Sequence, residues 1–506
     1  MAPTNAIVVF DAELETHASD QSPDREGGVP RAWAAPLPHG RGSDSEHAIA
    51  LRVACCRDGV LPPMLDIKFI REHVDKVRSA CEVKAVACDL DRLLDVDARR
   101  RSIQQEADTL RGKSKELSGQ VGLYKNPKSK WHQKALADGR AVEELRAEGD
   151  KIQAESAQIK RRIKELEEEA KTVAEAFNAL MLTVPQVPTE KTPVGKDEAD
   201  NVEVRRVGEP RQFAFEPKDH VELGTALGII DIERGVKLAG ARNYLLHGAG
   251  SLMHQAVLRL AMDTITSRGY EPVTVPVLVR DEMMYGTGYY PGGEEQAYRC
   301  ERDDKSLVGT AEVSLTAMHG GEILAEADLP IKVAAMSTCF RREAGAAGKD
   351  TYGIYRIHFF DKVEQVVLCR ADDAESEKFH HEIIANAEAV LQALELPYRV
   401  VIVCTGDMGQ GKVEMYDIET WMPSRGNYCE THSASRFGSF QARRLSLRYR
   451  DAERNIHFCH TLNNTVIASP RILIPILELN QNPDGSVTVP KALRPYMNGL
   501  ERIEPR

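Results

Sequence analysis

Two long segments in the first third of the chain carry apolar residues at heptad spacing. In the second segment one series recurs every seven positions, and a partner series follows it by four: Leu145, Ile152, Ile159, Leu166, Val173 and Leu180, then Gly149, Ser156, Ile163, Ala170 and Phe177. In the first segment the spacing alternates between four and three, at Ile103, Ala107, Leu110, Ser114, Leu117 and Val121. Such patterns are typical of helices that pack along one seam.

A polar turn region separates the two segments and is expected to break the first helix at Gly122 and Pro127. The pattern therefore predicts an antiparallel helical hairpin of about 40 residues per helix, roughly 60 Å long at 1.5 Å per residue. Residues 65–82 predict a short helix opened by Asp66. The Pro-rich stretch 183–201 is interpreted as a linker.

Beyond the linker the pattern becomes mixed, with a predicted helix over 251–268 followed by a strand over 270–279. Further strands are expected at 331–343, 354–368, 398–404, 413–422 and 427–433, a helix at 372–395, and a strand, turn and buried helix over 462–479. Hairpin-linked strands with few βαβ units indicate an antiparallel sheet flanked by helices. The predicted fold class is α+β, with a helical arm before the sheet domain.

The expected domains follow from these changes of pattern. Residues 1–63 are rich in Gly, Pro, Ser, Arg and Asp without periodicity, which predicts a disordered extension. The predicted division is 1–63 extension, 64–182 helical arm, 183–201 linker and 202–506 sheet domain.

One predicted strand has an unusual polar face. Over 354–368 the residues alternate, with Arg356, His358, Phe360, Lys362 and Glu364 on one face and Tyr355, Ile357, Phe359 and Val363 on a core-like face. Arg341 and Glu343 share a parity, so they can join the polar face from the neighbouring strand. Cations, a carboxylate and an exposed ring suit a polyanionic ligand with a flat ring, such as ATP. The alternative is an amphipathic edge hairpin with salt-bridged charges in solvent.

Composition narrows the choice of partners only slightly. The net charge is −11, so nothing in the whole-chain charge marks a nucleic-acid-binding protein. The hairpin is locally basic at Arg99, Arg100, Arg101, Lys113, Lys115, Lys125, Lys128, Lys130, Lys160, Arg161 and Arg162, with acids between. This pattern fits either a dimerisation coiled coil or an arm for a distant partner.

Other motifs are informative by their absence from the sequence. The ten cysteines show no metal-binding spacing, so free thiols in a reducing cytoplasm and no zinc are expected. No apolar run approaches the roughly 18 residues of a membrane span, so no membrane partner is expected. No P-loop or Rossmann glycine fingerprint is found, so ATP would have to be bound by the sheet itself.

Three separated blocks carry a family resemblance. They are the helix from 251 with the strand through Thr274-Val275-Pro276, the stretch FRREAGAAGKDTYGIYRIHFFDKVE (340–364), and LNNTVIASPRILIPILEL (462–479). These blocks look like motifs 1, 2 and 3 of class II aminoacyl-tRNA synthetases. With the helical hairpin, the chain from Met64 onward resembles bacterial-type seryl-tRNA synthetase.

The resemblance implies a serine–tRNA ligase. Such an enzyme forms seryl-adenylate from L-serine and ATP and then transfers the seryl group to tRNA(Ser), or also to tRNA(Sec) where that is present. It also implies a cytoplasmic homodimer, with Pro276 near the interface and the arm as tRNA reader. Two rivals are an aminoacyl:carrier-protein ligase of the synthetase type and a catalytically inactive coiled-coil scaffold.

The same resemblance assigns the site residues. The catalytic set is Arg341, Arg471 and Glu343. The implied ATP contacts are Arg341, Arg342, Glu343, Ile357, Phe360, Glu430, Thr431, His432, Ser433 and Arg471, with Glu430 and Ser433 holding Mg²⁺. The implied serine contacts are Thr310, Ala311, Glu312, Arg341, Glu364 and Thr465.

The roles implied are specific. Arg341 would grip the α-phosphate and the serine carboxylate, Arg471 the γ-phosphate, and Phe360 would stack on adenine while Glu343 accepts from its amino group. The chain departs from the common bacterial pattern at Asn464 and Val466, where glycines are usual, and at Lys349, where arginine is common. It also has Thr431-His432 in place of Ile-Ser between Glu430 and Ser433.

Overall fold

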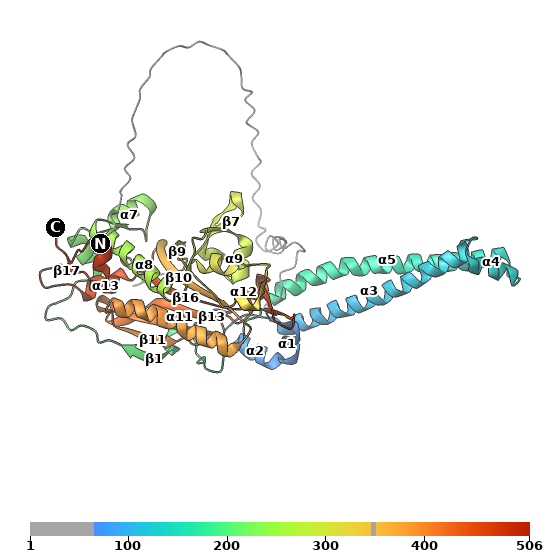
Figure 1. Ribbon diagram of the computed structural model, residues 1–506, viewed down its shortest axis with the longest axis horizontal. Coiled ribbons are helices and arrows are strands. Elements are labelled where there is room, and N and C mark those ends of the chain that lie inside the picture. Colours follow the sequence, from blue (N-terminus) through green and yellow to red (C-terminus); the bar gives the residue numbers. More distant parts are fainter. Residues whose placement is uncertain (1–64, 346–350) are drawn as a thin grey trace, which may run out of the picture. The chain divides into compact units, whose positions relative to one another are not determined.

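The computed structural model describes residues 65–345 and 351–506 (Figure 1). The expectations for residues 1–63 and for Lys349 fall outside these ranges. None of the helices within these ranges is both long and apolar enough to cross a membrane.

The heptad segments form the two long helices α3 (Leu90–Lys125) and α5 (Val142–Met181), which lie side by side (Figure 1). Their seam consists of buried apolar clusters, one around Ile103 and Leu166 and one around Leu117 and Ile159. The predicted helical hairpin is therefore confirmed.

The predicted break at Gly122 is wrong, because α3 continues to Lys125 and ends just before Pro127. One glycine costs a helix only about 1 kcal/mol, too little to end it. The turn region contains a further helix, α4 (Lys130–Ala137), capped where the Ser129 hydroxyl accepts from the amide of His132 at 3.0 Å.

Residues 65–82 form two helices where one was expected. These are α1 (Ile67–Glu72) and α2 (Val74–Val83), separated at His73, whose φ of −132° lies outside the helical region. Asp66 caps α1 as predicted, since its carboxylate accepts from the amide of Lys68 at 2.8 Å.

The centre of the remaining chain is an eight-stranded sheet. Its strands, in spatial order, are β1 (Val202–Val207), β11 (Tyr398–Ile402), β12 (Glu414–Met422), β13 (Asn427–Arg436), β16 (His460–Ser469), β10 (Phe359–Cys369), β9 (Ile331–Phe340) and β4 (Glu271–Pro272). All neighbours are antiparallel except β4, which runs parallel to β9. The α+β class with an antiparallel sheet is thus confirmed.

Alternation along β10 separates the core from the opposite face of the sheet. Val363 and Val367 pack in the main core with the helices α8 (Ala249–Ser267), α11 (Asp373–Ala393) and α13 (Leu473–Leu479). Phe360, Lys362 and Glu364 point the other way, as a period of two requires.

Shorter elements complete the described structure. The helices are α6 (His220–Ala226), α7 (Ile232–Ala239), α9 (Asp281–Thr287), α10 (Glu312–Ala317) and α12 (Phe440–Arg444). The small sheets pair β2 (Ile230–Asp231) with β3 (Leu245–Leu246), β5 (Leu278–Arg280) with β7 (Lys305–Leu307) and β6 (Tyr298–Cys300), β15 (Ile456–Phe458) with β14 (Arg448–Arg450) and β8 (Ile323–Ala325), and β17 (Val487–Thr488) with β18 (Arg502–Ile503).

Two strand predictions differ from the structure. Strand β10 starts at Phe359, so 354–358 is an irregular turn and its expected alternation is wrong there. The run 270–279 is divided between β4 and β5. Prolines at 272 and 276 explain the division, because proline cannot donate to a ladder.

The predicted linker, 183–201, contains one short 3-10 helix, Glu198–Asp200, and otherwise extended or turn backbone. It is fastened by backbone hydrogen bonds to the segment 404–413. The amide of Gln186 donates to the Gln410 carbonyl at 2.8 Å, and that of Thr189 donates to the Val413 carbonyl at 2.9 Å. The division of the chain into domains remains a prediction.

Candidate active site

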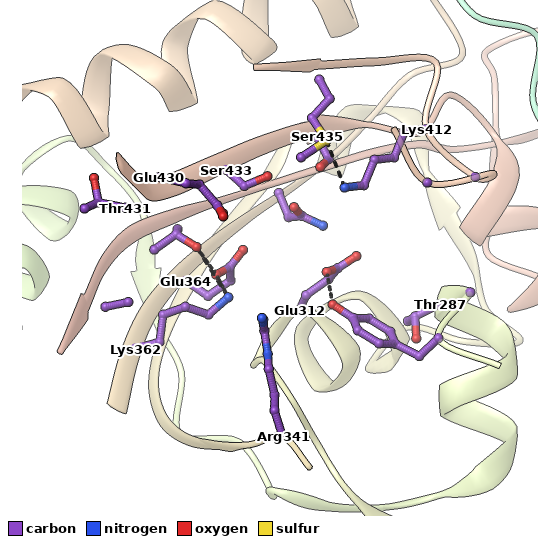
Figure 2. A pocket seen from close by; sticks show the side chains of 18 of the residues that line it. Thr287, Glu312, Arg341, Lys362, Glu364, Lys412, Glu430, Thr431, Ser433 and Ser435 are labelled. Atoms are coloured by element: carbon purple, nitrogen blue, oxygen red, sulfur yellow. Dashed lines mark hydrogen bonds and ion pairs between the residues drawn. The ribbon is translucent and has the colours of Figure 1, made fainter. Parts of the chain in front are cut away.

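A cavity of about 370 Å³ lies on the face of the sheet that carries Phe360, Lys362 and Glu364 (Figure 2). Its walls come from β10, β12, β13 and β16 and from the loops around Tyr289, Tyr355 and Gly411. Segments far apart in the sequence therefore meet around one polar space.

Most of the residues singled out from the sequence line this cavity: Glu312, Arg341, Glu343, Ile357, Phe360, Glu364, Glu430, Thr431, Ser433, Thr465 and Arg471. Four others do not. Arg342 is exposed outside the cavity, whereas Thr310, Ala311 and His432 are buried behind its wall.

The buried residues behind the wall have structural contacts. The Thr310 hydroxyl accepts from the amide of Glu312 at 3.2 Å, at the start of α10, and so helps to orient Glu312. His432 lies 2.8 Å (Nδ1) from the Thr431 hydroxyl, and burial lowers the pKa of His432 to about 3. His432 is therefore a neutral imidazole at physiological pH.

Two arginines stand at the aromatic side of the cavity. The guanidinium of Arg341 lies 5.3 Å from the centre of the Phe360 ring, and its Nε donates to the Gly309 carbonyl at 3.3 Å. Arg471 lies 4.4 Å from the Tyr355 ring centre, and a guanidinium nitrogen is 3.8 Å from a carboxylate oxygen of Glu430. Both planar cations thus border a space large enough for a polyanion.

Glu343 has a strained backbone, with φ of +50°. Its carbonyl accepts from Arg242 at 2.8 Å, and its carboxylate accepts from Arg356 at 3.5 Å. Left-handed backbone at a non-glycine residue costs energy and clusters at functional sites. The arginine contacts hold Glu343 in the cavity wall although β9 has already ended at Phe340.

A buried polar group forms the floor of the cavity. Lys362 and Glu364 are 2.5 Å apart, and the Thr465 hydroxyl donates to Glu364 at 3.3 Å. Burial raises the pKa of Glu364, and the ammonium of Lys362 opposes that shift. The register between β10 and β16 shifts after Val363, which places Thr465 directly opposite Glu364.

Glu312 is fixed on the other side of this floor. The Tyr289 hydroxyl donates to one carboxylate oxygen at 2.8 Å, and the Gln441 amide donates to the other at 2.7 Å. Burial raises the pKa of Tyr289 well above its usual value, so the phenol keeps its proton. The cavity therefore presents two oriented carboxylates to a small polar molecule.

Glu430 and Ser433 give a set of hard oxygen donors on β13. Asp417 pairs with Ser433 across the β12–β13 ladder, and its buried Oδ1 has no hydrogen-bond partner among the described residues. Burial, with the charge of Glu430, raises the pKa of Asp417. This donor set fits a divalent cation such as Mg²⁺. Within 65–345 and 351–506 no cluster of three or more His, Cys, Asp and Glu could hold a metal, so phosphate and water would complete its shell.

Two family models match the chain. The seryl-tRNA synthetase N-terminal domain matches residues 64–188, and the class II core domain of the G, H, P, S and T synthetases matches 298–480. A serine–tRNA ligase of Deinococcus radiodurans is 47% identical over 87% of this chain and 98% of its own length. The chain belongs to the seryl-tRNA synthetase family.

Other seryl-tRNA synthetases agree with this assignment. A serine–tRNA ligase of Symbiobacterium thermophilum is 43% identical over 87% of the chain and its full length. The seryl-tRNA synthetase of Pyrococcus horikoshii, solved with ATP, aligns with a TM-score of 0.79 at 36% identity, over 87% of this chain and all of its own. The cytoplasmic serine–tRNA ligase of Naegleria fowleri, solved with AMP, aligns with a TM-score of 0.76 at 30% identity, over 87% of this chain and 99% of its own.

Some residues of this synthetase cavity escaped the sequence analysis. Lys362 stood in the alternating pattern between Phe360 and Glu364, so its place in the cavity, though not its pairing, was readable. Lys412 follows the glycine-bearing run 404–411, which gave a weak signal. Tyr289 lies in an irregular loop, where periodicity carries no information, and Tyr355, which was assigned to the core-like face, packs in the main core and also lines the cavity.

Proposed function

We propose that this protein is a serine–tRNA ligase that forms seryl-adenylate from L-serine and ATP and transfers the seryl group to tRNA(Ser). The observation that carries the proposal is the combination in one cavity of two arginines with the buried Glu364–Thr465 floor. The first group suits phosphates, and the second suits a small amine and hydroxyl.

Adenylate formation needs cations more than a base. The serine carboxylate attacks the α-phosphorus, and repulsion between the two anions is the main obstacle, which positioned guanidinium groups relieve. Arg341 would meet both the α-phosphate and the carboxylate, and Arg471 the γ-phosphate. Phe360 offers a platform for adenine, with Ile357 and Glu343 beside it in the same wall.

Serine selection would rest on the buried floor. The Glu364 carboxylate would accept from the serine ammonium and hydroxyl, with Thr465 and Glu312 close by. A site that hydrogen-bonds a substrate hydroxyl strongly rejects an analogue without one, because its own buried groups stay unpaired. Alanine should therefore be excluded more strongly than a substrate that differs only in size.

Glu430 and Ser433 would hold Mg²⁺, which supplies positive charge to the triphosphate when it is bound. The support is the set of hard oxygen atoms on β13 and the Oδ1 atom of Asp417, on the neighbouring strand β12, which has no hydrogen-bond partner among the described residues. A metal site without zinc and a reducing cytoplasm are further parts of the proposal, since oxygen donors and not thiolates surround the proposed cation.

RNA binding is assigned to the helical arm, where several cations at the tip and along the helices are available for phosphate contacts. Some basic residues along the helices are already paired across the hairpin, as Arg99 is with Glu169 and Arg162 with Glu106, whereas others such as Lys160 form no ion pair among the described residues. The tip cations form no ion pairs among the described residues: Lys128, Lys130, Lys134 and Arg140. Unpaired cations are the ones that gain from phosphate contacts.

A homodimer is part of the proposal. A second cavity of about 650 Å³ lies where α8 meets β9 and β4, and its lining mixes apolar residues such as Met262 and Met336 with polar ones such as His254 and Asp361. Met336 is 52% exposed although it lies in the central sheet. A partner subunit would cover this apolar surface.

The decisive experiment is amino-acid-dependent ATP–pyrophosphate exchange, followed by charging of tRNA(Ser). Serine should support exchange, and alanine, cysteine and threonine should support it poorly. Exchange without any charging of tRNA would favour the carrier-protein ligase. Absence of exchange with serine from folded protein would overturn the proposal and leave the inactive scaffold.

A further inference from the structure

Lys84 is a buried amine that the proposed function does not use. It follows α2 directly, is only 5% exposed, and its Nζ donates to the carbonyls of Lys412 at 2.6 Å and Gln410 at 3.2 Å. It forms no ion pair with any described carboxylate, and burial, with the neighbouring charge of Lys412, lowers the pKa of Lys84 to about 7. A cation held only by carbonyls is a costly way to stabilise a fold.

The turn that Lys84 holds is a wall of the active-site cavity. Gly409, Gln410, Gly411 and Lys412 all line it. The ammonium of Lys412 reaches the sulfur of Met415 at 3.0 Å, beside Ser435 (Figure 2). The turn is also tightly packed, because a Cβ atom at Gly411 would lie 2.5 Å from the Phe440 ring.

The other end of the arm holds the same turn. The Gln410 side chain donates to the carbonyl of Leu182, the residue that directly follows α5, at 3.1 Å. The Gln410 carbonyl accepts from the amide of Gln186 at 2.8 Å as well as from Lys84. The residues just before α3 and just after α5 therefore meet at one point of the cavity wall.

We propose that Lys84 is a positioning residue that ties the base of the helical arm to the 409–412 turn and thereby shapes the serine side of the active site. In Figure 2, Lys412 lies toward Thr287 and Glu312 and away from Thr431. The turn borders the amino-acid side of the cavity, because Gly411 lies against the Phe440 ring and the next residue, Gln441, donates to Glu312 at 2.7 Å. The inference rests on the proposed function, because serine activation is its readout.

The test compares Lys84→Met with Lys84→Arg and with the matched control Lys76→Met, at an exposed site in the preceding helix α2. Lys84→Met removes the hydrogen bonds to the carbonyls of Gln410 and Lys412 and keeps roughly the length of the side chain. We expect a serine KM about tenfold higher in pyrophosphate exchange, an ATP KM within about twofold, and faster amide hydrogen exchange over 404–413. Thermal stability should not fall, because a desolvated charge has been removed. Lys84→Arg should restore most of the serine KM.

The possible results distinguish a positioning role of Lys84 from a purely structural one. Unchanged serine KM and unchanged amide exchange over 404–413 in Lys84→Met would overturn the inference. A lower melting temperature with both KM values raised equally would also overturn it, since Lys84 would then be only structural. If Lys84→Met does not fold, Lys84→Gln replaces it. Wild-type protein without serine-dependent exchange would instead refute the proposed function.

Discussion

The helical arm and the active-site cavity use the same kinds of charged pair in opposite settings. In the arm, Lys113 and Glu155 pair at 2.6 Å with their side chains 53% and 45% exposed. In the cavity, Lys362 and Glu364 pair at 2.5 Å with 7% and 2% exposed. Exposed pairs contribute little to stability, whereas a buried pair loses hydration that must be offset. A buried pair that faces a cavity is therefore better explained by ligand binding than by folding.

The largest effect should come from the cavity. Arg341→Ala should reduce serine-dependent pyrophosphate exchange by at least about 10³-fold, because it removes the fork-shaped cation that is proposed to hold the α-phosphate and the serine carboxylate. Steady-state exchange assays measure this. The melting temperature serves as the control, and activity within tenfold of wild type would contradict the assigned role.

Deleting residues 92–180 should have the opposite pattern of effects, with amino-acid activation kept and tRNA charging lost. The deletion leaves the cavity and both anchors, Lys84 and Leu182, in place, so exchange should stay within a fewfold of wild type. Charging of tRNA(Ser) should fall by about 100-fold or more, since the phosphate contacts are lost. Intact charging would show that the arm is not the RNA reader.

Lys362→Met tests the buried pair through pH. Without the ammonium, burial and the nearby Glu312 raise the pKa of Glu364 further. In the proposed site serine binds to ionised Glu364, so the rise in serine KM on acidification should begin at a higher pH than in wild type. The pH dependence of folding stability has the opposite sign. A carboxyl whose pKa is raised in the folded state stabilises that state at low pH, and this contribution is lost as the pH rises through the folded-state pKa. Identical pH profiles for the two proteins would argue against the pair.

The smallest effect should come from the exposed pair in the arm. Arg99→Ala removes the bond to Glu169 at an exposed site and should lower the free energy of unfolding by less than about 1 kcal/mol. Leu166→Ala, in the seam, is the contrasting variant and should cost about 2–5 kcal/mol. Denaturant unfolding followed by circular dichroism measures both.

Local patterns predicted the arm and most of the sheet well. The heptads of α3 and α5 and the alternation of Phe360, Lys362 and Glu364 depend on neighbouring residues, so the sequence reveals them. The irregular turn at 354–358 was misjudged because alternating residues also occur where no strand partner exists. Thr310 and His432 were matched to ligand positions but lie behind the wall, since burial depends on the whole fold.

Long-range contacts were beyond sequence reasoning. The tie between Lys84 and Gln410 joins residues 326 positions apart, and neither residue belongs to a motif that names the other. The register shift that sets Thr465 against Glu364 likewise depends on how two distant strands align. Such features follow from tertiary packing and not from local preference.

The fastening of residues 186–195 along the 404–413 segment bears on protein engineering. The amide of Thr405 donates to the Pro193 carbonyl and that of Gly406 to the Gly195 carbonyl, at 2.9 and 3.0 Å. An arm exchanged between relatives at a boundary inside this stretch would separate paired backbone groups. Chimeric enzymes should instead be joined within α3 and α5, so that each recipient keeps its own seam between arm and cavity.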